Sequence, residues 1–312
     1  MDYMIVQVKN LRKYFGKTEV LRGINFSAPA GSVLGMLGPN SAGKTTTINC
    51  LTTLLKPDDG SATIAGYDVV TQPAAVRALI GLTGQFAAVD EELTARENLV
   101  LFGRLLRLSS VKAARRGAEL LEQFDLTAAA NLRVKKLSGG MRRRLDLAIS
   151  IVTEPLVLFL DEPTTGLDPY SRRQVWNMVR ALKAQGMTIL LTTQYLEEAD
   201  ELADWIVVID RGQAIAQGTV DELKNRVGET FCELRLADPG DEQKVRGSLA
   251  DLGEITGSTT LTLPAAKGVV TLTEVLRRVE AIGVNLTDVS LRRPSLDDVF
   301  FALTGHTTDP HF

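Results

Sequence analysis

Short apolar runs, each bounded by turn-forming residues, recur along about the first two-thirds of the chain. Such runs, separated by helical segments, predict a buried and mostly parallel sheet with helices between its strands. They lie at residues 33–38, 156–163, 188–194 and 206–210. The pattern also predicts strands over 4–8 and 20–27, a helix over 45–55, and a turn followed by a strand over 57–66. The fold class indicated is α/β.

Two stretches depart from this rhythm. From about Pro73 to Lys136 the periodicity is mostly helical, so we expect a helical subdomain, about residues 86–150, inserted into the α/β core. After about Lys224, alternating strand-like segments surround an amphipathic helix over 272–283, which predicts a small C-terminal α+β domain. The expected domains are residues 1–220 and 225–305, followed by a tail over 306–312.

Composition excludes several classes of protein. The 312 residues carry a formal net charge of −3, which gives no reason to expect a nucleic-acid partner. Cys50 and Cys232 are far apart and lack metal-ligand spacing, as expected for core residues in a reducing compartment. No signal peptide is visible, and no run approaches the roughly 18 apolar residues that span a bilayer. If the protein serves a membrane, we expect it to do so from outside the lipid.

A phosphate-binding loop is the first candidate for chemistry. The pattern G-x-x-x-x-G-K-[ST] is matched by Gly38, Pro39, Asn40, Ser41, Ala42, Gly43, Lys44 and Thr45, and Thr46 follows in the predicted helix. Backbone N–H groups of such a loop point at phosphate oxygens, and the helix N-terminus adds its positive dipole end. Lys44 would neutralise the β- and γ-phosphates of ATP, and the Thr45 hydroxyl would ligate Mg²⁺. A chance glycine-rich turn is the alternative, but the strand before and the helix after favour phosphate binding.

A second candidate is a pair of acids after a buried strand. The apolar run 156–160 ends in Asp161 and Glu162, where open α/β sheets bind ligands. We expect Asp161 to hold Mg²⁺ through water and Glu162 to polarise the attacking water. Adjacent acids alone are common on protein surfaces, so this prediction depends on the phosphate-binding loop upstream.

The segment Leu137-Ser138-Gly139-Gly140-Met141 resembles the LSGGQ signature of the ABC ATPase family. The resemblance covers roughly residues 4 to 220 and implies an ABC-type P-loop NTPase core. It implies that Ser138, Gly139 and Gly140 cap the γ-phosphate of an ATP held by a partner subunit, and a glycine pair at a helix N-terminus is a suitable anion site. Ser138 also fits a simple helix N-cap, which does not exclude the first role.

The same resemblance assigns four further residues. Gln85 matches the Q-loop, which contacts the Mg²⁺ site, and Asp168 lies in a D-loop that crosses the dimer interface. Phe15 falls where the family stacks an aromatic ring on adenine, with Tyr14 as the alternative. Gln194 stands where the family usually has a switch histidine. An amide can contact the γ-phosphate but cannot become a cation near neutral pH, so hydrolysis should depend on Glu162.

Four segments together resemble the daunorubicin/doxorubicin-resistance type of ATP-binding subunit: residues 83–99, 138–146, 190–204 and 292–305. The resemblance implies a separate ABC-2-type transmembrane partner, export of a hydrophobic drug, antibiotic or lipid, and a location on the cytoplasmic face of the membrane. It also makes residues 86–100 the expected docking surface for that partner, the alternative being an exposed acidic loop. The C-terminal domain is expected either to contact a second copy or to stabilise the core.

Rival functions are less well supported by the sequence. One chain holds one phosphate-binding loop and one signature, and the family's composite sites need two of each, so a homodimer or a heterodimer with a similar chain is expected. Neither motif is degenerate, which favours the homodimer. A soluble ABC ATPase acting on ribosomes or DNA would be expected to show two cassettes, coiled coils, zinc motifs or a basic surface, and these are not visible. A metabolic kinase would have no use for the signature and D-loop pair.

Overall fold

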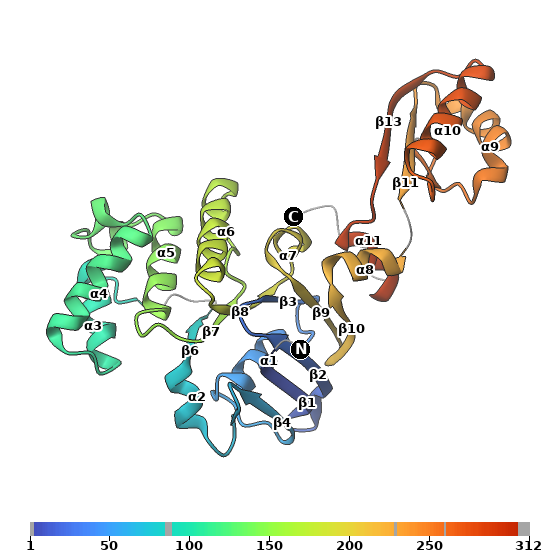
Figure 1. Ribbon diagram of the computed structural model, residues 1–312. Helices are drawn as coiled ribbons and strands as arrows, with labels where there is room; N and C mark the ends of the chain where they lie inside the picture. The colour runs from blue at the N-terminus through green and yellow to red at the C-terminus, as the bar shows by residue number, and fades with distance from the viewer. Residues whose placement is uncertain (1–2, 85–88, 228–229, 259, 305–312) are drawn as a thin grey trace. The chain divides into compact units, whose positions relative to one another are not determined.

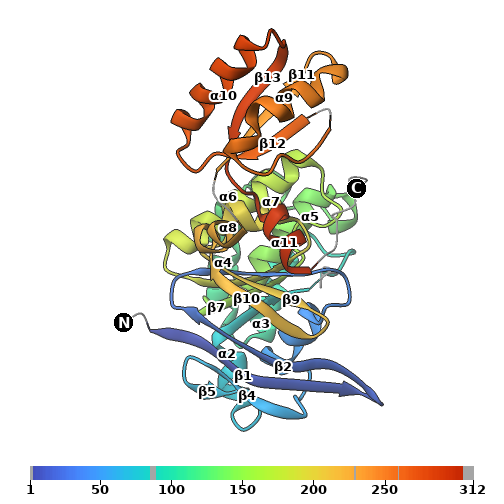
Figure 2. The same ribbon diagram turned by 90° about the vertical axis from the view of Figure 1, so that its right-hand side faces the viewer.

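The computed structural model describes residues 3–84, 89–227, 230–258 and 260–304 (Figures 1 and 2). The chain divides into two compact units, Met1–Val220 and Asp221–Phe312. Each unit has its own buried hydrophobic residues.

A six-stranded sheet forms the centre of the first unit. Its strands, in spatial order, are β10 (Gln213–Thr219), β9 (Trp205–Asp210), β3 (Val33–Leu37), β8 (Thr188–Thr193), β7 (Val157–Asp161) and β6 (Ile80–Thr83). All neighbours pair in parallel except β10, which runs antiparallel to β9. Strands β3, β7 and β8 are buried along their whole length, as expected for a sheet covered on both faces. The predicted parallel sheet is confirmed.

A second, antiparallel sheet covers one side of the same unit. It consists of β2 (Thr18–Pro29), β1 (Met4–Phe15), β4 (Asp59–Ile64) and β5 (Tyr67–Asp68). Helix α1 (Lys44–Leu51) contacts both β2 and β4 of this sheet and β7 of the other. Strand β1 extends well beyond the predicted 4–8, because register shifts let its pairing with β2 continue through polar positions, whereas β2 is close to the predicted 20–27.

Helices complete the first unit. They are α2 (Pro73–Leu79), α3 (Ala95–Leu105), α4 (Ser110–Gln123), α5 (Gly139–Ser150), α6 (Pro169–Ala184) and α7 (Leu196–Leu202), with short 3₁₀ turns at Thr127–Ala129 and Val134–Lys136. Helices α3, α4 and α5 pack on one another and form a helical group in Figure 1. The expectation of mostly helical structure from Pro73 onward is wrong at Ile80–Thr83, because these four residues form β6 beside β7.

The second unit is a small α+β structure. Its three-stranded antiparallel sheet has the order β12 (Thr260–Pro264), β11 (Phe231–Leu236) and β13 (Leu286–Arg292). The unit also contains α8 (Val220–Val227, whose first residue belongs to the first unit), α9 (Glu242–Leu249), α10 (Val269–Ala281) and α11 (Leu296–Thr304), and 3₁₀ turns at Pro239–Asp241 and Ala250–Leu252. Side chains of β11, α9 and α10 share one core, which includes Leu234, Val245 and Val275.

Both cysteines are buried and free, Cys50 on α1 in the first unit and Cys232 on β11 in the second. Burial raises the pKa of each thiol to about 11. Among the residues that the structure describes, no helix is long and apolar enough to cross a lipid bilayer.

Candidate functional site

The candidate residues of the first unit gather at the carboxyl edge of the central sheet. Strand β8 lies between β3 and β7, so the loop after β3, the residues after β8 and the acids after β7 leave the sheet side by side. Asp161, the last residue of β7, pairs with Thr192 near the end of β8. The carboxyl edge of an open α/β sheet is the usual place for ligands in this architecture.

Two glycines give the phosphate-binding loop its shape. Gly43 has a φ of 108°, and a Cβ there would come within 2.8 Å of the Leu21 side chain. At Gly38 a Cβ would lie 2.1 Å from the carbonyl oxygen of Ile209 on β9. Any other residue would therefore displace the loop from the sheet, so both glycines are required by geometry.

The loop holds its own lysine. The Lys44 ammonium donates hydrogen bonds to the carbonyl oxygens of Gly38 at 2.6 Å and Pro39 at 3.0 Å. Burial lowers the pKa of Lys44, and the charges of Glu162 and Asp161 act against that shift. Because an ammonium has three donors, one remains for a phosphate oxygen.

Asp161 and Thr45 offer a set of hard oxygen ligands. The Thr45 hydroxyl donates to Asp161 Oδ1 at 3.3 Å, and the Thr192 hydroxyl donates to the same oxygen at 2.5 Å. Mg²⁺ prefers oxygen ligands and is usually held by one or two protein groups together with substrate phosphates. The residues present therefore fit Mg²⁺.

Glu162 has an unusual backbone conformation. Its φ of 49° is in the left-handed region, which costs a residue with a side chain on the order of 1 kcal/mol or more. Its backbone N–H donates to the Thr192 hydroxyl at 3.0 Å, and its carboxylate accepts a bond from the Thr165 hydroxyl at 3.2 Å. These contacts hold the carboxylate at the wall of the pocket, where a water activated for attack would lie.

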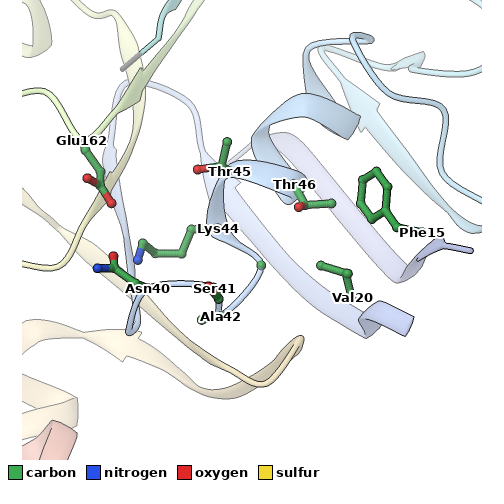
Figure 3. A pocket seen from close by; sticks show the side chains of 10 residues that line it. Phe15, Val20, Asn40, Ser41, Ala42, Lys44, Thr45, Thr46 and Glu162 are labelled. Atoms are coloured by element: carbon green, nitrogen blue, oxygen red, sulfur yellow. The ribbon is translucent and has the colours of Figure 1, made fainter. Parts of the chain in front are cut away.

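One pocket extends from Lys44 and Glu162 to Phe15, the residue predicted to stack on adenine. It has a volume of about 330 Å³ and is lined by Phe15, Val20, Asn40, Ser41, Ala42, Gly43, Lys44, Thr45, Thr46 and Glu162. Lys44 extends toward Asn40 and Glu162, whereas Phe15 lies at the far end beside Val20 (Figure 3). Tyr14 is not among the described lining residues, and its hydroxyl donates to Glu19. An elongated ligand with an aromatic end and a polyanionic end suits this pocket.

The signature residues form a second group. Ser138 is the N-cap of α5 and accepts a hydrogen bond from the Met141 N–H at 3.2 Å. A Cβ at Gly140 would lie 2.5 Å from the Ser171 hydroxyl, so the signature packs against the start of α6. Gly139 is exposed. None of these three signature residues is among the described residues that line the phosphate-loop pocket.

Asp168 belongs to this second group. It is the N-cap of α6, and its carboxylate accepts bonds from the Ser171 N–H at 2.9 Å and the Ser171 hydroxyl at 2.7 Å. The first of these bonds is the main reason that the pKa of Asp168 is lowered. The carboxylate is therefore charged and directed toward its own helix.

The two glutamines predicted to contact the γ-phosphate or Mg²⁺, Gln194 and Gln85, are not among the described residues that line the pocket. Gln194 directly follows β8 and is exposed, two residues beyond the Thr192 hydroxyl that contacts both acids. Gln85 lies outside the described residues, as do residues 86–88 of the predicted docking segment.

Comparisons with known proteins identify the family. The family model described as "ABC transporter" matches residues 21–165. A second family model, "ATP-binding protein DrrA1-3-like, C-terminal domain", matches residues 218–304. Daunorubicin resistance ATP-binding protein DrrA2 of Streptomyces coeruleorubidus is 54% identical and covers 99% of this chain and 98% of its own. The chain belongs to the ABC transporter family, in its DrrA branch.

Further relatives agree with this assignment. The doxorubicin resistance ATP-binding protein DrrA of Mycobacterium tuberculosis is 51% identical, covering 99% of this chain and 95% of its own. A solved nucleotide-free ATP-binding cassette from an ABC transporter has a TM-score of 0.65 at 28% identity, covering 72% of this chain and 94% of its own. This DrrA-type chain is thus an ATP-binding and ATP-hydrolysing subunit that works with transmembrane partners, and its relatives do not favour action on ribosomes or DNA.

Several residues that contact the two acids of this ABC site were not predicted from the sequence. Thr192 contacts both acids, and Thr165 contacts Glu162, but threonines near strand ends carry no distinctive pattern. Arg143 is buried behind the acids, although its place in a run of three arginines is typical of an exposed helix face. Arg144 is buried as well, so the run of arginines offers no pattern that separates Arg143 from its neighbour or shows what it contacts.

Proposed function

We propose that two copies of this chain bind ATP and Mg²⁺ at composite sites and drive an ABC-2-type exporter at the cytoplasmic face of the membrane. The observation that carries the proposal is a pocket lined by Lys44, Thr45 and Glu162, with Phe15 at its far end. Asp161 adjoins this pocket through its hydrogen bond from Thr45.

Within one copy, each residue group has a separate task. Phe15 stacks on the adenine, and the loop N–H groups and Lys44 hold the phosphates. Mg²⁺, which Thr45 and Asp161 would hold, supplies positive charge against the phosphate oxygens. Glu162 orients a water for in-line attack on the γ-phosphorus and accepts its proton as ADP leaves.

A second copy completes the site. The signature residues Ser138, Gly139 and Gly140 form a group distinct from the phosphate-loop pocket of the same copy. Their helix N-terminus is a suitable anion site, so we assign it to the γ-phosphate bound by the other copy. Asp168 crosses between the copies, and Gln85 and Gln194 sense the γ-phosphate and its Mg²⁺.

The cargo is proposed from relatives. Several of the most similar proteins are named for resistance to daunorubicin or doxorubicin, and a more distant one, at 35% identity, for resistance to linearmycin. These names support export of a hydrophobic drug or antibiotic by the membrane partner of this chain, with a lipid as the broader class.

The proposal is tested by co-purification of the chain from detergent-solubilised native membranes, followed by mass spectrometry. We expect a multi-span ABC-2-type protein to be recovered with it. In the Glu162→Gln variant, we expect the complex to remain and ATP hydrolysis to fall by at least about 100-fold. Recovery of ribosomal or DNA-repair proteins without a membrane protein would reject the transport function.

A further inference from the structure

Arg143 is a buried cation directly behind the candidate catalytic acid. It lies in the second turn of α5, the helix that begins at the signature, and is only 9% exposed. All three guanidinium nitrogens donate to main-chain oxygens: Nε to Pro163 at 2.7 Å, Nη1 to Gly84 at 2.9 Å and Nη2 to Asp161 at 3.4 Å. One side chain thus joins the signature helix, the end of β7 and the residue that precedes Gln85.

The acceptors of Arg143 bracket Glu162. Asp161 and Pro163 are its two chain neighbours, and the guanidinium binds the carbonyl oxygen of each. Glu162 itself has a left-handed backbone, with a φ of 49°. Such a conformation persists only where its surroundings impose it. Arg143 is well placed to impose it, because it fixes the peptide groups on both sides.

The charge on Arg143 is retained despite its burial. Burial lowers the pKa of the guanidinium, and the carboxylates of Asp146, Glu198 and Asp161 oppose that effect. Asp146 lies 3.3 Å away on the same helix. A guanidinium remains protonated in proteins, and its planar fork can bind several oxygens at fixed angles, which a lysine ammonium cannot reproduce.

We propose that Arg143 is a positioning residue for ATP hydrolysis, which fixes the backbone at Glu162 and so aims its carboxylate at the attacking water. The inference rests on the proposed role of Glu162. Arg143 also connects the signature helix α5 to Glu162, because any displacement of α5 relative to β7 changes the hydrogen bonds on either side of Glu162.

Arg144 provides a matched control on the same helix. It is 8% exposed, and its hydrogen-bond acceptors among the described residues are the carbonyl oxygens of Phe124 and Asp125 and the Asp125 carboxylate, each at 3.1 Å. Arg143→Lys and Arg144→Lys therefore both disturb buried hydrogen bonds to main-chain oxygens, but only those of Arg143 go to the two chain neighbours of Glu162.

The experiment compares these two variants and Glu162→Gln as full-length chains. Steady-state ATPase assays give kcat and KM, and size-exclusion chromatography with ATP but without Mg²⁺ measures the ATP-bound dimer. For Arg143→Lys we expect kcat to fall about 10- to 100-fold, KM for ATP to stay within about threefold, and the dimer to form as in Glu162→Gln. For Arg144→Lys we expect kcat close to wild type.

The outcomes distinguish a failure of the proposed role of Arg143 from a failure of the proposed role of Glu162. If Arg143→Lys loses ATP binding, dimer formation and thermal stability to the same extent as kcat, Arg143 only stabilises the fold and the inference is wrong. A wild-type kcat in Arg143→Lys, with Glu162→Gln inactive, rejects the inference alone. Wild-type hydrolysis in Glu162→Gln rejects the proposed function on which it rests.

Discussion

At the residue scale, we expect position 194 to decide whether the ATPase rate responds to pH near neutrality. Gln194 directly follows β8, whose Thr192 contacts both candidate catalytic acids, and the two histidines of the chain are His306 and His311, near its C-terminus. A neutral amide does not titrate between pH 5 and 8, whereas a histidine there would.

We expect kcat of the wild type to show no ionisation near pH 6.5 that depends on residue 194. Gln194→His should introduce one, with kcat changing between about pH 6 and 7. The measurement is kcat from pH 5.5 to 8.5 for the wild type, Gln194→His and Gln194→Ala. A wild-type ionisation in this range that Gln194→Ala abolishes would contradict the expectation.

A second residue links stability to pH. Glu198 on α7 is completely buried and accepts bonds from the Thr164 hydroxyl at 2.8 Å and the Trp176 indole N–H at 3.0 Å. Burial raises its pKa above the ordinary 4.5, and hydrogen bonds from Thr193, Thr164 and Trp176 oppose this only in part. The folded state therefore binds a proton at Glu198 more tightly than the unfolded state does.

The stability that this proton contributes is complete below about pH 4.5 and is lost as pH rises through the folded-state pKa. Glu198→Gln keeps an acceptor for Thr164 and Trp176 but cannot lose a proton. We expect its free energy of unfolding, relative to wild type, to increase from pH 5 to pH 8 in urea titrations. An equal pH dependence in both proteins would show that Glu198 does not titrate with a raised pKa.

At the scale of elements, the edge strand β6 depends on one glycine. A Cβ at Gly81 would lie 2.2 Å from the Ser150 carbonyl oxygen at the end of α5, and 3.1 Å from Leu158 and Pro155. We expect Gly81→Ala to destabilise the chain by about 1–3 kcal/mol, because backbone must move to admit the methyl group. Urea unfolding measures this loss.

The control is Gly247→Ala in α9, where a Cβ would meet nothing within 4 Å. Alanine is favoured over glycine inside a helix, so this variant should be neutral or more stable by up to about 1 kcal/mol. If both variants have the wild-type free energy of unfolding, the close approach of β6 to α5 is not a constraint.

Most elements could be predicted from the sequence where periodicity was strong. The apolar runs of β3, β7, β8 and β9 are long enough to be distinctive, and so is the loop after β3. Strand β6 has only four residues, Ile80–Thr83, and directly follows helix α2. Its pattern of apolar residues therefore resembles a continuation of that helix. Its strand conformation comes from pairing with β7, which lies far along the chain.

Only some residues of the candidate site could be predicted from the sequence. Motif spacing identified Lys44, Thr45, Asp161 and Glu162, which the structure brings together. Spacing could not identify Arg143 or Thr192, because their importance comes from main-chain and side-chain partners in other segments. A backbone carbonyl can accept a hydrogen bond whatever its side chain, so a residue that acts through such bonds has no partner motif in a single sequence.

At the scale of the whole molecule, we expect the second unit to contact a second copy. Val269 and Val270 at the start of α10 are 68% and 67% exposed, and Leu276 on the same helix is 37% exposed. Removing residues 225–312 should therefore weaken dimerisation, measured by sedimentation equilibrium. An unchanged monomer–dimer equilibrium would assign the unit a packing role only.

A finer test keeps the chain whole. Replacing both Val269 and Val270 with Asp should raise the dimer dissociation constant by about tenfold or more, because charge would be buried at the contact. Val111→Asp, at a position on α4 that is 80% exposed, is the control and should leave the dissociation constant unchanged. Equal dissociation constants in both variants would mean that α10 does not form the contact.

The two buried cysteines provide one native reporter in each compact unit. Since the pKa of each thiol is about 11, only about one in a thousand is a thiolate at pH 8, and each is shielded by its own core. An alkylating reagent can therefore react with Cys50 or Cys232 only when the surrounding unit opens. Peptide mass spectrometry of the labelled chain would give the opening rate of the ATPase unit and of the C-terminal unit from a single sample, without an engineered probe.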